Sequence, residues 1–257
     1  MIELATVASH LDALLGTASI PDYPGALNGL QLANRQPITR VAAAVDVSKR
    51  VIEQVVARDA NLLIVHHGMF WGGAQPIVGS AYDRLRLLLA HDVAVYASHL
   101  PLDAHPSLGN NVLLAAALGL EPTAGFARYK AIDVGVQGMS DVPTSDMRDR
   151  AEKFASQHGG SVRSSPIAQG RRTRRWAICT GAGASSETLL EAQAGGIDTL
   201  IVGEGPHHTA VAAEDADIVV IYAGHYATET LGVQAVAEHL TTTFGIPSTF
   251  IRAPTGL

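Results

Sequence analysis

Short apolar runs alternate with amphipathic segments along most of the chain. The runs contain many β-branched residues, and six of them are Val41–Val47, Leu62–Val65, Val93–Ala97, Trp176–Thr180, Thr199–Val202 and Ile218–Tyr222. Such continuous runs are typical of strands that are buried on both faces of a parallel sheet. The segments between them have helical spacing, as in the stripe Val51, Ile52, Val55 and Val56. The alternation predicts an α/β fold with mostly parallel or mixed sheets covered by helices.

This alternation is interrupted once, near the middle of the chain. Residues Glu121 to Lys130 have the composition of a linker, and a second α/β pattern begins at Ile132. We assign residues 1–125 together with 224–257 to a first domain, which carries most of the candidate ligands described below. Residues 126–223 form the predicted second domain.

Composition narrows the class of protein. The chain has 257 residues, is 47% hydrophobic and carries a formal charge of −6, which argues against a nucleic-acid-binding surface. The run Arg171–Arg175 is a local exception, and a solvated loop or a salt-bridged interface segment explains it more simply than RNA binding. The first residues read as an amphipathic helix without a basic leader, and no apolar run has the length of a membrane span. We therefore expect a cytoplasmic protein without a membrane partner.

One cysteine, Cys179, is present, so a disulfide within one chain is excluded. It follows Trp176-Ala177-Ile178 in a predicted strand, which favours a buried, unreactive thiol.

Histidines and carboxylates gather where predicted strands end. His66-His67 follow Leu62–Val65 directly, while His99 precedes Asp103 and His225 precedes Glu229 by four residues each. Ligands bind beyond the carboxyl ends of strands in open α/β sheets. Pro101 is expected to keep the segment between His99 and Asp103 out of a helix.

A single histidine at a strand end is more often a hydrogen-bonded structural residue than a metal ligand. The joint pattern favours metal binding, because imidazoles and carboxylates together suit Zn²⁺, Fe²⁺ or Mn²⁺. Neighbouring strand residues point to opposite faces, so the His66-His67 pair suits two ions, which in such centres lie about 3.5–4 Å apart. Asp46, at another strand end, is a candidate to orient a ligand.

Five segments together resemble the NIF-three-like dinuclear metal-centre family, whose bacterial members often carry the label GTP cyclohydrolase I type 2 homologue. The segments are VDVSKRVIEQV, LLIVHHGMFWGG, SHLPLD, DTLIVGEGPHH and GHYATETLGVQAVAEHL. The resemblance extends from Asn28-Gly29-Leu30-Gln31 to the final helix. It differs from the family pattern where SHLPLD replaces an HTNLD-like stretch.

The resemblance implies a fold, a site and an assembly. By motif, the metal ligands are His66, His67, Asp103, His225 and Glu229, and His99 occupies the position of the histidine that precedes the aspartate. The family fold has two α/β domains with the metal site at their interface, assembled as a toroidal homohexamer, a trimer of dimers. Glu204, His207 and His208 also match family positions, as groups that contact substrate or support the ligands.

These features predict a metal-dependent hydrolase with two divalent ions per chain. Two cations lower the pKa of bound water and stabilise charge on the attacked group, with Glu229 and Asp103 as the expected catalytic carboxylates. Cyclohydrolase or phosphoester chemistry on a small, nucleotide-like substrate fits this hypothesis, although only the family label points to GTP. The alternative is a metal-stabilised hexameric scaffold or regulatory module without turnover.

Overall fold

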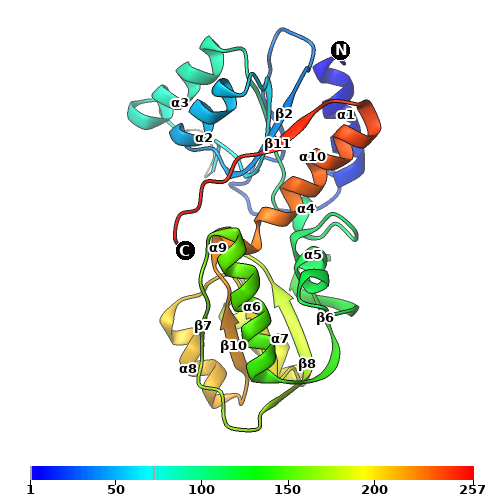
Figure 1. Ribbon diagram of the computed structural model, residues 1–257, viewed down its shortest axis with the longest axis vertical. Helices are drawn as coiled ribbons and strands as arrows, with labels where there is room; N and C mark the ends of the chain where they lie inside the picture. Colours follow the sequence, from blue (N-terminus) through cyan, green and yellow to red (C-terminus); the bar gives the residue numbers. More distant parts are fainter. Residues whose placement is uncertain (1, 72, 74) are drawn as a thin grey trace. The chain divides into compact units, whose positions relative to one another are not determined.

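The chain forms two compact α/β units, each with its own mixed sheet (Figure 1). The computed structural model describes residues 2–71, 73 and 75–257. Gly72, in the motif LLIVHHGMFWGG, lies outside the described residues. Unit 1 comprises Met1–Leu102 and Gly232–Ala253, and unit 2 comprises Asp103–Leu231 and Pro254–Leu257. The predicted α/β fold class is confirmed.

Unit 1 contains a five-stranded sheet in the order β1-β4-β3-β2-β11. Its strands are β1 (Gly29–Leu32), β2 (Val41–Asp46), β3 (Leu62–His67), β4 (Ala94–Ala97) and β11 (Ser248–Phe250). All neighbours pair in parallel except β1, which runs antiparallel to β4 at the edge. The long apolar runs thus occupy the central strands, as the sequence predicted.

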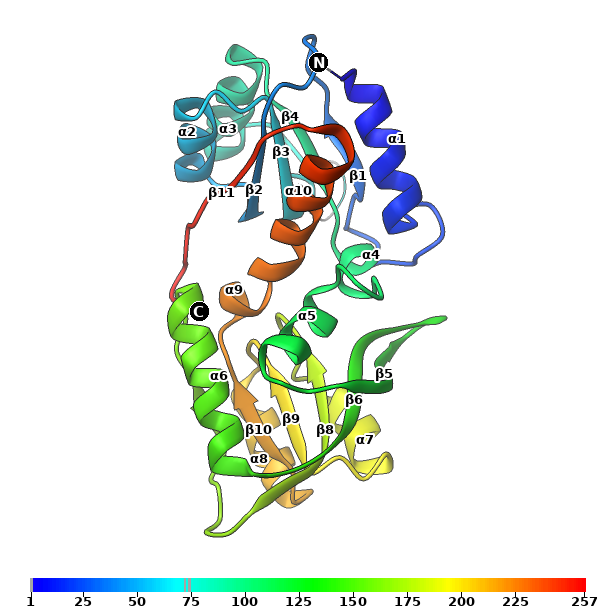
Figure 2. The same cartoon turned by 45° about the vertical axis from the view of Figure 1, so that its right-hand side comes forward.

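Helices cover both faces of this sheet (Figures 1 and 2). The helices α2 (Lys49–Ala57) and α3 (Gly79–Ala90) pack on the face that carries alternate strand residues such as Ala44, Val65 and Val95. Ser48 accepts a hydrogen bond from the Val51 N–H and caps α2, as predicted. On the other face lie α1 (Leu4–Leu15) and α10 (Thr230–Phe244), joined by a 2.8 Å contact between the Nε2 atoms of His10 and His239.

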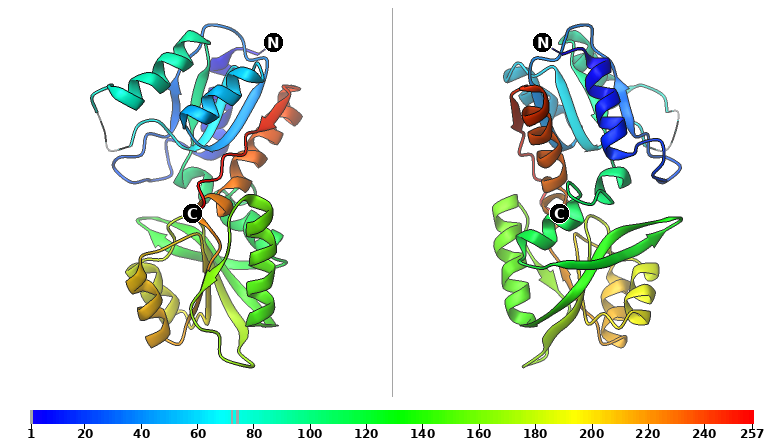
Figure 3. Two further views of the ribbon diagram at one scale, coloured as in Figure 1. Left: turned by 60° about the vertical axis from the view of Figure 1, so that its left-hand side comes forward. Right: turned by 90° about the vertical axis from the view of Figure 1, so that its right-hand side faces the viewer.

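Unit 2 contains a six-stranded sheet in the order β5-β6-β8-β9-β10-β7. Its strands are β5 (Pro122–Tyr129), β6 (Ile132–Pro143), β7 (Arg163–Ser164), β8 (Arg172–Cys179), β9 (Thr199–Val202) and β10 (Val219–Tyr222). Strands β8, β9 and β10 are parallel, and the others pair antiparallel. Figure 3 shows the long β5–β6 hairpin in green.

The helices of unit 2 also lie on both faces of its sheet (Figure 3). On one face α5 (Asn110–Ala117), α6 (Thr144–His158) and the short α9 (His225–Thr228) pack around Trp176. The other face is covered by α7 (Ser186–Ala194) and α8 (His207–Asp215), which contact each other. A four-residue helix, α4 (Leu100–Asp103), precedes α5 in the chain.

Two sequence predictions about local structure were wrong. The expected linker 121–130 contains strand β5, which pairs with β6 from Pro122 to Tyr129. An edge strand with few buried apolar residues has no strong hydrophobic pattern, and only Phe126 and Ala127 are buried in β5. Pro101 does not exclude a helix, because it lies in the first turn of α4. Backbone N–H groups in a first turn have no partner within the helix, so the missing N–H of proline costs no helical hydrogen bond there.

The compact units have boundaries that differ from those of the predicted domains. Residues 103–125 and 224–231 belong to unit 2, together with the candidate ligands Asp103, His225 and Glu229. The reason is packing, since Leu114 of α5 and Ala227 of α9 are buried in the same core as Trp176. Amphipathic stripes show that a helix is buried but not which sheet it covers.

Arginines of the basic run 171–175 form ion pairs within unit 2. Arg172–Arg175 lie on β8 and not in a loop. Arg171 pairs with Asp217, and Arg172 pairs with Asp141. This supports the salt-bridged interpretation of the run over RNA binding. In the described part of the chain, no helix is both long and apolar enough to cross a membrane.

We predict that the native protein resists thiol modification. Cys179 is buried, and burial together with the nearby Asp103 and Glu229 carboxylates raises the pKa of its thiol to about 12. Because the thiolate is the reactive form, a maleimide at pH 8 should label the denatured chain rapidly and the folded chain far more slowly. Mass spectrometry of quenched samples checks this, and equal labelling rates would contradict the burial of Cys179.

Candidate metal centre

In unit 1 the parallel register brings three strand ends together. Asp46 of β2 pairs with His67 of β3, and Val65 pairs with Ala97 of β4. After the Val65–Ala97 pair, the chain continues with His66-His67 on β3 and with Ser98-His99 beyond β4. The sheet therefore places all three histidines at one edge, as the sequence analysis expected for the carboxyl ends of parallel strands.

The three imidazoles form one cluster. His66, His67 and His99 each offer a ring nitrogen, and these nitrogens all lie within 4.8 Å of one another. The ring centroid of His66 is 4.8 Å from that of His67 and 4.9 Å from that of His99. His66 and His67 are adjacent in sequence, yet they converge because β3 ends there.

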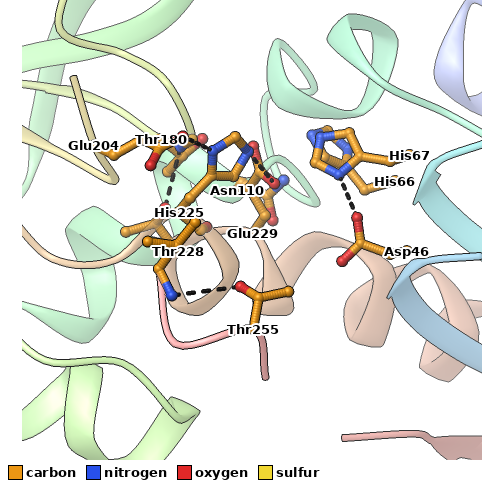
Figure 4. Close-up of polar contacts among 12 residues, drawn as sticks. Asp46, His66, His67, Asn110, Thr180, Glu204, His225, Thr228, Glu229 and Thr255 are labelled. Carbon is orange, nitrogen blue, oxygen red and sulfur yellow. Dashed lines mark hydrogen bonds and ion pairs between the residues drawn. The ribbon is translucent and has the colours of Figure 1, made fainter. Parts of the chain in front are cut away.

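In each imidazole of the cluster, Nδ1 is bonded to a fixed oxygen. His66 Nδ1 lies 2.9 Å from the Ser98 carbonyl oxygen, and His67 Nδ1 lies 2.9 Å from Asp46 Oδ1 (Figure 4). His99 Nδ1 is 2.9 Å from Asp22 Oδ1. Since each partner is an acceptor, Nδ1 carries the proton and Nε2 presents its lone pair. Metal-binding histidines are oriented in this way.

The sequence analysis named Asp46 but missed Asp22, which holds the loop around His99. Asp22 accepts hydrogen bonds from the Asn28 side chain and the Leu100 N–H. Asn28 Oδ1 in turn accepts the His99 N–H at 2.8 Å. Asp22 is 77 residues from His99 in a stretch that reads as a turn, so only the pairing of β1 with β4 reveals its role.

The charge on Asp22 is stabilised by these partners. Burial raises the pKa of its carboxyl group, but the bonds from His99, Asn28 and the Tyr23 N–H outweigh burial and lower the pKa below its usual value. Asp22 is therefore an anion that favours positive charge near His99.

The loop after His67 is held by Gln31 from the Asn28–Gln31 motif. Gln31 Oε1 accepts the Met69 N–H at 2.7 Å. A Cβ atom on Gly68 would lie 2.1 Å from Gln31 Nε2, so a larger residue would displace the Gln31 side chain. The glycine in the His66-His67-Gly68 motif thus has a packing role beside the cluster.

Unit 2 brings a second set of donors to a sheet edge. Cys179, Val202 and Tyr222 are in register at the ends of β8, β9 and β10. The loops that follow contain Thr180-Gly181, Gly203-Glu204 and Gly224-His225, respectively. Three parallel strands therefore deliver the donors in the same manner as in unit 1.

His225 lies between two carboxylates. Its Nδ1 is 2.8 Å from Glu204 Oε1, and its Nε2 is 3.2 Å from Glu229 Oε2 (Figure 4). Burial lowers the pKa of His225, but bonds to Glu229 and Glu204 outweigh this and raise it to about 9. Glu204 thus orients His225, one of the two roles that the sequence analysis considered for it.

Glu229 lies at the break between α9 and α10 and is only 3% exposed. The loop after β8 is shaped around it, because a Cβ atom on Gly181 would lie 2.1 Å from Glu229 Oε1. Gly181 also has a φ angle of +62°, in the left-handed region that favours glycine. A carboxylate buried to this extent requires compensation by positive charge or hydrogen bonds.

Asp103, the third donor of unit 2, is 6% exposed at the end of α4. Asn110 Nδ2 donates to its Oδ1 at 2.8 Å, and Thr180 Oγ1 lies 3.5 Å from the same atom. The adjacent Asn111 accepts the Thr180 N–H at 2.9 Å, which ties the start of α5 to the end of β8. Asp103 is therefore held by the loops that also surround Glu229.

In the described part of the chain, the paired histidines at the start of α8 belong to neither group of clustered metal donors, although His207 lines a cavity together with Glu204. His207 and His208 are both exposed. Among the described residues, neither has a hydrogen bond to a candidate ligand, and they are not in the histidine cluster.

The donor set fits a divalent metal. Unit 1 supplies three imidazole Nε2 atoms with fixed direction, and unit 2 supplies an imidazole and two buried carboxylates. Imidazole and carboxylate are the preferred ligands of Zn²⁺ and of Fe²⁺ and Mn²⁺ centres. The histidine cluster of unit 1 is thus a candidate metal site whose imidazoles are oriented by oxygen acceptors.

We predict that Asp22→Asn and Asp46→Asn each weaken metal binding. Both changes keep the size of the side chain but remove the charge that orients an imidazole, and loss of such a partner typically costs about 10–100-fold in affinity. Zn²⁺ competition with a fluorescent chelator measures this. Asp92→Asn, a change in the same unit at a residue that accepts the Arg35 and Gln36 N–H groups, should keep the wild-type affinity. Equal affinities for all four proteins would contradict the prediction.

A second prediction concerns the stability of the protein after a chelator has removed metal. The pKa of His225 is raised from 6.5 to about 9, so its protonated form stabilises the fold. This contribution is complete below pH 6.5 and is lost as the pH rises through 9. The melting temperature of the wild type relative to His225→Gln should therefore fall across this range in thermal unfolding by circular dichroism. A difference that does not change with pH would show that the carboxylates do not hold this proton.

Comparisons with known proteins agree with this geometry. The family model Duf34/NIF3 (NGG1p interacting factor 3) matches residues 2–255. A relative from Pyrococcus abyssi, called GTP cyclohydrolase 1 type 2 homolog, is 39% identical over 259 residues and covers 100% of both chains. A relative of the same name from Deinococcus radiodurans is 39% identical over 242 residues, covering 91% of this chain and 88% of its own.

Solved structures are similar over the full length. The structural-genomics protein ybgI, described as of unknown function, has a TM-score of 0.90 at 31% identity, with 100% of both chains covered. TTHA1606 from Thermus thermophilus has a TM-score of 0.83 at 32% identity, also with complete coverage. The matched length and identity confirm the resemblance drawn from the sequence motifs, and the chain belongs to the Duf34/NIF3 family.

Proposed function

We propose that this protein is a metal-dependent hydrolase that uses two divalent ions per chain. One observation carries the proposal. Each of the four imidazoles His66, His67, His99 and His225 has its Nδ1 bonded to a fixed oxygen, at 2.8–2.9 Å. Structural histidines need one such bond. The three clustered rings His66, His67 and His99 direct Nε2 away from their Nδ1 acceptors, and His225 Nε2 faces the buried Glu229 carboxylate, which supports a role as ligands.

The proposed ligands are the three histidines of unit 1 and the residues Asp103, His225 and Glu229 of unit 2. Their mixture of imidazole and carboxylate favours Zn²⁺, Fe²⁺ or Mn²⁺. When bound, such ions supply Lewis acidity, which lowers the pKa of water and stabilises negative charge on the attacked group. We propose Glu229 and Asp103 as the catalytic carboxylates because both are buried acidic residues of the donor set.

The protein's own residues would position these ligands and control their protons. Asp46, Asp22 and Glu204 accept the Nδ1 protons and thereby fix the ring tautomers. Such carboxylate partners strengthen imidazoles as metal ligands. Trp71 packs edge-on against His99, with the ring centroids 4.9 Å apart, and limits the rotation of that ring.

The substrate class remains part of the proposal. Relatives carry the name GTP cyclohydrolase 1 type 2 homolog, which supports ring opening or phosphoester hydrolysis on a small, nucleotide-like molecule. We further propose that the chain assembles as a homohexamer, a trimer of dimers, as the motif resemblance implies. A metal-stabilised scaffold without turnover is the competing function, and the following experiment separates the two.

We predict that Glu229→Gln keeps the fold and assembly but removes most hydrolytic activity. The change preserves the shape of a buried side chain and deletes one charge, and loss of one such transition-state interaction typically lowers kcat about 10²–10³-fold. The activity is measured with a nucleotide and phosphoester panel, the metal content by elemental analysis, and the mass by light scattering. Wild type should carry close to two ions per chain and have a mass near six chains. Glu238→Gln, at an exposed position of α10, is the matched control and should behave as wild type.

Three results would count against parts of this proposal. Wild type without metal, from cells grown with ample zinc, iron and manganese, would exclude the metal centre. If Glu229→Gln dissolves the assembly, the ions act as a structural clamp. If turnover is unchanged in this variant, the carboxylate is not catalytic.

A further inference from the structure

Unit 2 contains a cavity that the metal ligands do not line. Its volume is about 390 Å³, within the size range of small-molecule sites. It lies where β9 and β10 end and α8 begins, and Figure 1 shows β10 and α8 beside β7. Its polar lining side chains are Ser161, Arg163, Glu204, His207 and Tyr222. The cavity therefore combines hydrogen-bonding side chains with one cationic side chain, Arg163, and one carboxylate, Glu204, which is paired with His225.

Arg163 and Tyr222 face the cavity as a cross-strand pair. They are register partners in the antiparallel ladder of β7 and β10, so their side chains lie next to each other on one face. Within the described part of the chain, the Arg163 guanidinium has neither an ion pair nor a hydrogen bond. A guanidinium offers five N–H donors in a planar fork that matches phosphate and carboxylate oxygens. Arg163 is thus available to bind an oxyanion.

A second cavity in unit 2 shows that arginines beside a cavity can be paired with carboxylates, in contrast to Arg163. It has a similar volume, about 420 Å³, and is lined by three arginines. Each of them is paired with a carboxylate, since Arg148 contacts Asp149, Arg171 contacts Asp217 and Arg172 contacts Asp141. The arginines of the more basic cavity are therefore already paired. In the cavity at Arg163, the one carboxylate, Glu204, is paired with His225 and no described carboxylate is paired with Arg163.

The helices that begin at the two cavities also differ in the negative charge of their first turns. The helix α6 at the second cavity carries Asp146 in its first turn, but α8 has no acidic residue in its first turn. Negative charge near a helix N-terminus is stabilised by the exposed backbone N–H groups. At α8 that stabilisation remains available to a ligand.

We propose that the cavity at Arg163 binds a small molecule through an oxyanion group, with Arg163 as the anchor. Its volume exceeds the needs of a single phosphate ion, so the ligand has a polar body that contacts Tyr222, His207 and Ser161. Glu204 lines this cavity and also bonds His225, which places the bound molecule one side chain from that histidine. The proposal stands without the hydrolase activity and without bound metal.

Calorimetric titration with ribose 5-phosphate tests the site, with ribose, inorganic phosphate and gluconate as separate arms. Ribose 5-phosphate should bind more tightly than ribose or phosphate alone, and gluconate shows whether a carboxylate can replace the phosphate. Arg163→Gln should weaken binding at least about 10-fold, because it removes charge-assisted hydrogen bonds. Arg172→Gln, a change on a nearby strand at an arginine already paired with Asp141, should bind as wild type does.

Each titration is performed with protein as purified and after chelation, with the metal content measured in both. The site is supported if both preparations bind with equal affinity and only Arg163→Gln loses binding. This result does not depend on whether the hydrolase proposal is correct. Binding that disappears with the metal would assign the phosphate to the metal centre and overturn the inference. Unchanged binding by Arg163→Gln, equal loss in both arginine variants, or no binding by wild type would overturn it as well. Circular dichroism confirms that both variants are folded.

Discussion

The direction of four imidazole rings depends on hydrogen bonds that each ring makes with its Nδ1 atom. A histidine side chain can rotate about two bonds, and rotation would scatter the Nε2 atoms that a metal needs. Here a backbone carbonyl holds His66, and carboxylates hold His67, His99 and His225. These acceptors are themselves fixed, as Asp22 is by the Asn28 side chain and the Leu100 N–H. The precision of the candidate centre therefore comes from residues that would not touch the metal.

Parallel sheet geometry explains why these residues lie together in both units. Neighbouring parallel strands in register end at one edge, so polar residues that directly follow the apolar runs are neighbours in space. In unit 1 the register pairs Asp46 with His67, and in unit 2 it aligns Cys179, Val202 and Tyr222 just before the loops with Gly181, Glu204 and His225. Close approach of loops at such an edge leaves little space for side chains. Gly68 and Gly181 meet that constraint beside Gln31 and Glu229, respectively.

The sequence predicted the features that a local pattern encodes and missed those that depend on pairing. Buried central strands are visible as β-branched runs, and their last residues gave the positions of the histidines. Strand β5 was missed because an edge strand needs few apolar residues, and the helix α4 was missed because proline is tolerated in a first turn. Asp22 could not be found from its surroundings in the sequence, since its partner His99 is brought to it by β1. The assignment of α5 and α9 to unit 2 likewise depends on which core they cover.

The negative charge around His225 affects both the protonation of this histidine and the affinity of the site for cations. Glu204 and Glu229 lie at opposite nitrogens of one ring, and Glu229 is almost completely buried. Two carboxylates at such a site favour any positive charge between or beside them, which is why the pKa of His225 rises despite burial. A divalent cation carries more charge than a proton and experiences the same field. The raised pKa and the proposed metal affinity are therefore two consequences of one arrangement of charges, in contrast to the arginines of β8, where Asp141 already balances Arg172.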